Sequence, residues 1–182
     1  YQWYDATCGQ QIVVVWNAAD QCGNASAFTQ VYTVVDNVAP VMLCDFSSTV
    51  GFTGEYAPAN WTLENTGTGS GSVDASNAPA SITVIGSDSP DGSPQVYTYY
   101  TVEVVADGAI SFSWNVIEQD CDGAGYDYFG YLVNGVETEL ATVISNGNAF
   151  VSVNAGDVFG FYVRSTDNFC GPIVTIASEF MA

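Results

Sequence analysis

The chain has 182 residues, of which 20 are acidic and only one, Arg164, is basic, so the formal net charge is −19 with no Lys and no His. A chain with one cation cannot neutralise a run of phosphates or an anionic lipid surface, which excludes nucleic acid and direct membrane attachment as roles. The absence of Lys and His also removes Schiff-base chemistry, histidine general bases and histidine-ligated zinc.

Short β-rich segments bounded by turn residues follow one another along the chain, and 48% of the residues are hydrophobic. The clearest expected strands are 12–16, 28–35, 110–116 and 159–163. In 110–116, large apolar residues alternate with Ser and Asn, which places the apolar side chains on one face of the strand. The pairs Asp107-Gly108, Asn134-Gly135, Asn146-Gly147 and Gly156-Asp157 are typical of turns. With no amphipathic helix, the sequence predicts an all-β protein built from sandwiches.

A domain boundary is expected at Asp36–Pro40, where a strand ends in polar residues and a proline. Residues 1–40 hold only about three strands, too few for a core of their own. Residues 41–182 have a normal size for one jelly-roll-like β-sandwich. We therefore expect a partial module at 1–40 that is completed by other strands, followed by a sandwich at 41–182.

Two segments resemble modules of very long secreted proteins. The pattern W-x-A-x-D-x-C-G-N at 16–24 and the pattern V-D-x-x-A-P at 35–40 are similar to the closing half of an HYR-type immunoglobulin-like repeat. Such repeats occur in tandem in adhesins of gliding bacteria that use the type 9 secretion system. Segments 106–114, 129–135, 153–161 and 165–168 resemble a β-sandwich module of the same proteins. The resemblance implies an extracellular or cell-surface setting, of which the grappling-hook filaments of predatory gliders are one example.

The five cysteines form no Cys-x-x-Cys motif, and their wide spacing favours disulfides in an oxidising location. Cys8 and Cys22 flank one strand of the immunoglobulin-like piece and are expected to pair. Cys121 and Cys170 both lie in Asp/Gly-rich loops and form the second expected pair. Cys44 is left over, and two interpretations stay open for it: a bond to a neighbouring subunit or a buried free thiol.

The sharpest local signal is the segment 120–127, in which aspartates alternate with glycines. Carboxylate oxygens in such a loop can bind Ca²⁺, although the spacing is not that of an EF-hand. The candidate ligands are Asp120, Asp122, Asp127 and Asp157, and Asp167 and Glu118 are outside contributors. The alternative is an acidic, glycine-rich surface turn without a metal. Calcium is the only cofactor that the sequence suggests.

Aromatic residues suggest a sugar-stacking platform, for which the candidates are Trp61, Tyr97, Tyr99, Tyr100, Tyr126 and Tyr128. The alternative is that these side chains fill the core. Scattered carboxylates, and hydroxyl and thiol groups without a His or Lys to activate them, argue against an enzyme. The expected function is that of a structural building block of an extracellular filament or adhesin, which assembles with other copies by stacking or strand sharing. The alternative function is an adhesive module that binds carbohydrate on cell surfaces.

Overall fold

The computed structural model describes residues 11–33, 48–90, 92 and 94–182. The chain divides into two units, Tyr1–Phe46 and Ser47–Ala182. The predicted boundary between residues 40 and 41 lies outside the described residues, as do Cys8 and Cys44. Within the described ranges, no helix has the length and apolar character needed to span a membrane.

The described part of the first unit is an antiparallel hairpin of β1 (Gln11–Ala19) and β2 (Ala25–Thr33). Its turn is organised by Asp20, whose Oδ1 accepts the backbone N–H groups of Cys22 and Asn24, each at 2.9 Å. The Asp20 Oδ2 atom accepts the side-chain amide of Asn24 at 2.9 Å. The Asp and Asn of the W-x-A-x-D-x-C-G-N pattern therefore shape the hairpin turn.

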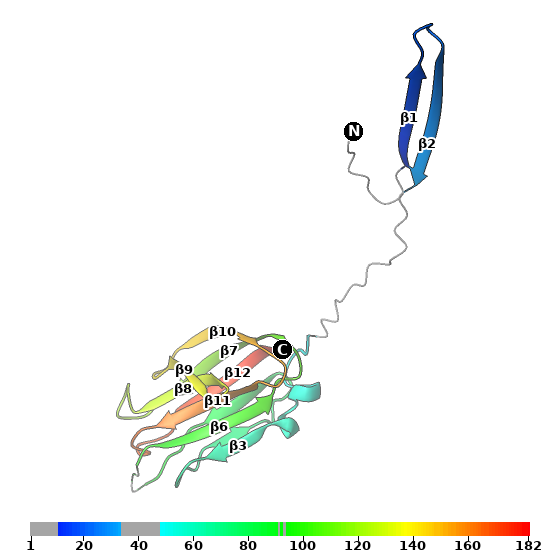
Figure 1. The fold of residues 1–182 in the computed structure, drawn as a ribbon. Helices are drawn as coiled ribbons and strands as arrows, with labels where there is room; N and C mark the ends of the chain where they lie inside the picture. Colours follow the sequence, from blue (N-terminus) through cyan, green and yellow to red (C-terminus); the bar gives the residue numbers. More distant parts are fainter. Residues whose placement is uncertain (1–10, 34–47, 91, 93) are drawn as a thin grey trace. The chain divides into compact units, whose positions relative to one another are not determined.

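The second unit is a sandwich of two five-stranded antiparallel sheets (Figure 1). The strands of the first sheet are, in spatial order, β10 (Asn146–Val153), β7 (Gly108–Glu118), β12 (Val174–Met181), β5 (Ser81–Ile85) and β4 (Ser72–Asp74). Those of the second sheet are β3 (Thr62–Asn65), β6 (Val96–Glu103), β11 (Val158–Ser165), β8 (Asp127–Val133) and β9 (Val136–Ala141). Two short 3-10 turns, Gly54–Tyr56 and Pro58–Asn60, precede β3.

The strands β5 to β12 follow a jelly-roll path. The chain passes back and forth between the sheets, so that the spatial orders β5-β12-β7-β10 and β6-β11-β8-β9 interleave early and late strands. This is the double Greek-key connection of a jelly roll. The predicted all-β class and the jelly-roll-like sandwich are confirmed.

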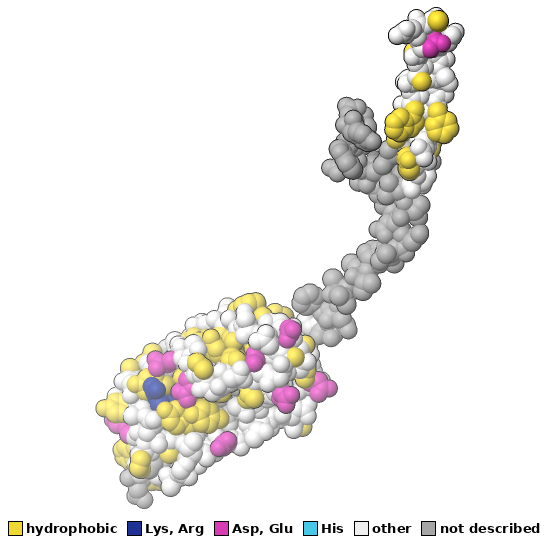
Figure 2. Space-filling model, viewed as in Figure 1, with side chains coloured by type: hydrophobic (Ala, Val, Ile, Leu, Met, Phe, Trp, Pro, Cys, Tyr) yellow, Lys and Arg dark blue, Asp and Glu magenta, His cyan; other side chains and the backbone are white. Residues whose placement is uncertain are grey.

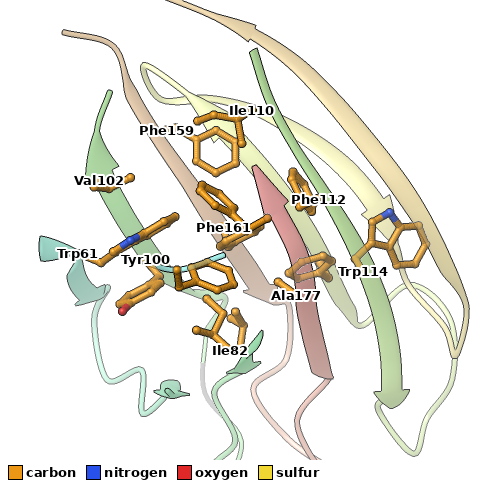
Figure 3. Close-up of a cluster of buried hydrophobic side chains, with 14 of the residues drawn as sticks. Trp61, Ile82, Tyr100, Val102, Ile110, Phe112, Trp114, Phe159, Phe161 and Ala177 are labelled. Carbon is orange, nitrogen blue, oxygen red and sulfur yellow. The ribbon is translucent and has the colours of Figure 1, made fainter. Parts of the chain in front are cut away.

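Aromatic side chains from both sheets fill the space between them (Figure 3). Trp61 stacks on Tyr100 with ring centroids 4.9 Å apart and on Phe161 with centroids 5.6 Å apart. Phe112 meets Phe161 edge to face at 5.0 Å. As the alternation in 110–116 predicted, Ile110, Phe112, Trp114 and Val116 are all buried. Such aromatic contacts add to the stabilisation that comes from burying apolar area.

The turn predicted at Asn134-Gly135 is confirmed: both residues have positive φ, and they connect β8 to β9. The prediction at Asn146-Gly147 was wrong, because these residues begin β10 and pair with Asn115 and Trp114 of β7. The reason is packing. A Cβ atom at Gly147 would lie 2.8 Å from Cζ2 of Trp114, so the glycine is needed where the indole ring passes beneath β10.

Candidate functional site

Two regions of the sandwich gather chemically active side chains: the loops at one end, and the outer face of the sheet β3-β6-β11-β8-β9. At the loop end, Cys121 and Cys170 form a disulfide with Cα atoms 5.4 Å apart. It joins the β7–β8 loop to the β11–β12 loop and is the second pair expected from the sequence. Cys22 is exposed in the hairpin turn and has no disulfide partner among the described residues.

Two of the predicted calcium ligands, Asp120 and Asp127, are buried at this end of the sandwich, and the Asp120 carboxylate lies near the two cysteine sulfurs. Asp120 is 1% exposed, and its Oδ1 accepts the backbone N–H of Asp122 at 2.6 Å. Asp127 is 2% exposed, and its Oδ2 accepts the backbone N–H of Ile173 at 2.8 Å. Asp122 itself is exposed in the same loop.

The structure does not bring Asp157 to this group. Ser165 of β11 pairs with Asp127 of β8, and Phe159 pairs with Val133 at the other end of both strands. Asp157 directly precedes β11 and therefore lies at the far end of the sandwich. There it accepts the Asn134 side-chain amide at 2.8 Å, which together with a backbone donor holds the pKa of its carboxyl below the ordinary value.

Asp167, one of the two outside contributors that the sequence suggested, lies in the β11–β12 loop. Its Oδ1 atom is buried without a hydrogen-bond partner, as is Oδ2 of Asp120. Burial, with smaller contributions from the negative charges of Asp120 and Asp167, raises the pKa of Asp127 to about 6. Burial also raises the pKa of Asp120, with Asp167 among the charges that add to the shift.

The second region is a layer of tyrosines on the outer face of the sheet β3-β6-β11-β8-β9. Tyr97 and Tyr99 of β6 stack in parallel with ring centroids 5.4 Å apart. In the register of the sheet, Tyr97 lies beside Arg164 and Tyr99 beside Tyr162, both on β11. Tyr128 of β8 lies on the other side of Arg164. These five side chains, which we call the tyrosine face, share one side of three neighbouring strands.

Arg164, the one basic residue of the chain, lies at the centre of the tyrosine face. Its guanidinium stands over the Tyr128 ring at 3.7 Å from the centroid, and its Nη2 atom lies 3.6 Å from the Glu139 carboxylate of β9. The side chain is about one-quarter exposed. Figure 2 shows this basic side chain bordered by acidic and hydrophobic side chains on the visible side of the sandwich. A guanidinium over an aromatic ring is a cation–π contact.

Glu137 of β9 ties the tyrosine face together from its edge. The Tyr99 hydroxyl donates to the Glu137 carboxylate at 2.9 Å. Burial, together with the neighbouring Glu137 charge, raises the pKa of Tyr162 to about 12. Burial and the hydrogen bond to Glu137 raise the pKa of Tyr99 as well. Both tyrosines therefore remain protonated; the Tyr99 hydroxyl proton is bonded to Glu137, and Tyr162 is only 1% exposed.

Half of the predicted sugar-stacking set lies elsewhere. Trp61 and Tyr100 belong to the core, as Figure 3 shows, because β6 alternates and Tyr100 points opposite to Tyr99. Tyr126 lies 40% exposed in the β7–β8 loop. The sequence analysis missed Tyr162 and Arg164. The same alternation that placed Phe159 and Phe161 inward was the signal that could have found them.

The outer face of the other sheet carries a hollow of about 380 Å³ that is lined mainly by hydroxyl and amide groups. Ser113 hydrogen-bonds with the side chains of Asn148, at 2.7 Å, and Glu179, at 2.5 Å. Trp114, which also lines it, is only 8% exposed. This hollow therefore offers polar atoms that already bond to one another and hardly any open ring surface.

No family model and no curated protein matches the sequence. Solved structures with a similar fold include a carbohydrate-binding module of the β-sandwich superfamily, at 13% identity and a TM-score of 0.48, with 95% of this chain and 74% of that chain covered. Another is the family 11 carbohydrate-binding module from Clostridium thermocellum in complex with a mixed-linked tetrasaccharide. Its identity is 10% and its TM-score 0.45, with 74% of this chain and 94% of that chain covered. A third is an adhesin domain of Lys-gingipain from Porphyromonas gingivalis W83. Its identity is 12% and its TM-score 0.45, with 74% of this chain and 96% of that chain covered. At these sequence identities and TM-scores, the similarity concerns only the arrangement of the strands.

Proposed function

We propose that the chain is part of an extracellular adhesive protein and that its sandwich module binds neutral glycans through the tyrosine face. The observation that carries this proposal is the arrangement of Tyr97, Tyr99 and Tyr128 around the one guanidinium of the chain, on the outer surface of a rigid sheet. Aromatic rings combine a large apolar surface with a hydroxyl that forms hydrogen bonds, which suits the two-sided chemistry of a pyranose.

The side chains of the tyrosine face are suited to binding a sugar. The C–H side of a sugar ring can stack on a tyrosine, while its hydroxyls bond to Arg164 and the carboxylates. Glu139 forms an ion pair with Arg164, and Glu137 accepts the Tyr99 hydroxyl, so both carboxylates serve as positioned acceptors. We therefore assign adhesion to this face and no catalytic step.

The charge of the face selects the class of glycan. Glu139 pairs with Arg164, Glu137 accepts the Tyr99 hydroxyl, and Glu64 of β3 lies opposite Tyr99 in the register of the sheet. Three carboxylates against one guanidinium leave a net negative charge. Sulfated or uronic-acid sugars would be repelled, so the ligand class is a neutral oligosaccharide.

A glycan array probed with the full chain, followed by calorimetry on the neutral oligosaccharides that bind, tests the proposal. We expect Tyr128→Ala and Arg164→Ala each to weaken binding at least tenfold, since each removes half of the cation–π pair. Phe150→Ala is the matched control, because Phe150 is 75% exposed on the opposite sheet. An array without neutral ligands, or an equal loss in the Phe150 variant, would contradict the assignment.

A second function, assembly through the N-terminal hairpin, is favoured by a separate observation. Large apolar side chains are exposed on both faces of the hairpin, with Val13 and Val31 on one face and Trp16 and Phe28 on the other. An isolated two-stranded sheet is only marginally stable in water. We propose that strands of a second copy of this chain complete it, as in a filament or a long adhesin. The oligomeric state of the chain in solution, measured by light scattering, tests this proposal.

A further inference from the structure

Each sheet of the sandwich has two end strands, which have a neighbouring strand on one side only. In the described part of the chain these are β10 and β4 in one sheet, and β3 and β9 in the other. Proteins protect such edges from unwanted pairing with short strands, charged residues or prolines. Three of the four edges here are protected in this way: β4 has three residues including Asp74, β3 has four including Glu64, and β9 has six including Glu137 and Glu139.

The end strand β10 has none of these protections. It is eight residues long, Asn146–Val153, and its sequence NGNAFVSV contains no charged residue and no proline. It ends its sheet along one side of the sandwich (Figure 1). A long, uncharged end strand is a template on which a further strand can pair.

The register of β10 on β7 shows which backbone groups of this edge are open. The backbone N–H of Val116 in β7 donates to the carbonyl of Ser145, directly before β10, at 2.8 Å. Bonded and non-bonded pairs alternate along an antiparallel ladder, so the odd-numbered residues of β10 bond to β7. The N–H and C=O groups of the even-numbered residues therefore point away from β7, towards the open edge. These residues are Asn146, Asn148, Phe150 and Ser152.

Phe150 makes this edge apolar as well as open. Its side chain is 75% exposed, the largest value among the large hydrophobic side chains that the structure describes. In a sheet, side chains directly opposite each other on neighbouring strands have Cβ atoms about 4.5–5.5 Å apart. A strand added to β10 with apolar side chains on the matching face would therefore cover the Phe150 ring.

The N-terminal hairpin has the properties that such a strand needs. Its strands β1 and β2 have nine residues each and no charged residue, which matches β10 in length and in lack of charge. Trp16 and Phe28 lie opposite each other on one face of the hairpin, and both are exposed. Because each copy carries a net charge of −19, contact between copies is least unfavourable where neither surface has a carboxylate.

We propose that the β10 edge of one copy receives a strand of the N-terminal hairpin of the next copy. This inference rests on the hairpin assembly proposed above and names the surface that completes the hairpin. Backbone hydrogen bonds along β10 hold the added strand, and the aromatic face of the hairpin covers Phe150. The hairpin and β10 are different surfaces, so the contact is heterologous and builds a ring or an open filament rather than a two-fold dimer.

The test is light scattering coupled to size exclusion on the full chain at 0.5 M salt. Phe150→Glu puts a carboxylate on the edge and should leave the chain monomeric. Ser152→Pro removes one outward N–H without removing a bond to β7, and should raise the Kd of assembly at least tenfold. Val136→Glu is the matched control, because it makes the same kind of exchange at a side chain 71% exposed on the end strand β9. It should assemble as the parent does.

Mixing two defective variants tests the head-to-tail contact directly. Trp16→Ser/Phe28→Ser keeps an intact β10, and Phe150→Glu keeps an intact hairpin, so each alone should be monomeric. Their mixture should form a complex with the mass of two chains and nothing larger, because only one productive contact is available. If Phe150→Glu does not fold, as judged by urea unfolding, Ser152→Pro takes its place in the mixture.

The outcomes separate this contact from hairpin assembly in general. A parent that stays monomeric would refute hairpin assembly and the β10 contact together. A parent that assembles while Phe150→Glu assembles equally well, or a mixture that gives no complex, would overturn the β10 contact alone. A loss of assembly in Val136→Glu equal to that in Phe150→Glu would overturn it as well, since the effect would then not be specific to β10.

Discussion

Arg164 and Asp127 acquire their properties from neighbours far away in the sequence. Arg164 lies between Tyr97 and Tyr128 and pairs with Glu139, so the one cation of the chain is part of a surface rather than of the core. Asp127 is 2% exposed and faces two further carboxylates, which is why its pKa rises to about 6. At the residue scale, the environment of each charge decides its role.

Asp127 leads to a prediction on pH. Its folded-state pKa of about 6 lies above the ordinary value of 3.8, so between these values the folded chain binds a proton that the unfolded chain does not. We therefore expect chelator-treated protein to become more stable as the pH falls from 7 towards 5. This one group should add roughly 1 kcal/mol to the free energy of unfolding by pH 5, and the full amount of about 2–3 kcal/mol only once the pH lies below 3.8. Urea unfolding curves at several pH values measure it.

The control for this prediction is Asp127→Asn, which cannot take up the proton. Its unfolding free energy should rise less over the same pH range, and an identical rise in both proteins would refute the assignment.

At the scale of the elements, the sheet β3-β6-β11-β8-β9 has two glycines, Gly130 and Gly160, that atoms of neighbouring strands approach closely. A Cβ atom at Gly160 of β11 would lie 2.7 Å from Cγ2 of Thr101 and 2.7 Å from the Tyr100 carbonyl oxygen, both on β6. One at Gly130 of β8 would lie 2.6 Å from Cε1 of Tyr162, so that ring packs against the glycine. A side chain at either position would therefore collide with the neighbouring strand.

Gly160→Ala should therefore destabilise the sandwich by about 1–3 kcal/mol, because β6 and β11 must separate to admit the methyl group. Chemical denaturation of the parent and the variant measures the difference. Gly108→Ala, at the start of β7, is the matched control, since a Cβ atom there meets nothing within 4 Å. Its stability should change by less than about 0.5 kcal/mol. A loss as large as that of Gly160→Ala would contradict the packing explanation.

At the scale of the whole molecule, the net charge of −19 opposes any assembly of copies. Like-charged modules repel, and salt screens this repulsion over about 10 Å at 0.1 M and about 3 Å at 1 M. The apolar side chains on both faces of the hairpin act in the opposite direction, since burying them in a second copy is favourable. Assembly through the hairpin is thus a balance between a local attraction and a long-range repulsion.

This balance predicts that oligomers of the chain form at high protein concentration and weaken in low salt with chelator. Light scattering coupled to size exclusion, at 0.02 M and 0.5 M salt, measures the mass in each condition. Trp16→Ser/Phe28→Ser should stay monomeric in both, while Val136→Ser, 71% exposed on the sandwich, should behave as the parent. A parent that is monomeric throughout, with all hairpin amides protected from hydrogen exchange, would refute strand sharing. Non-reducing mass analysis of the same fractions tests whether Cys44 links copies.

The sequence by itself determined the all-β class, the inward face of 110–116 and the turn at Asn134-Gly135, because alternation and positive φ are local properties. The presence of only one basic residue also argued against nucleic acid and anionic lipid surfaces as partners, because binding to them requires many basic side chains. The tertiary structure decided which aspartates meet and which tyrosines face outward. Tyr99 meets Glu137 across 38 residues of sequence, and Arg164 meets Glu139 only because β11, β8 and β9 are neighbours. Such contacts depend on strand order and register, which nothing in the local pattern specifies.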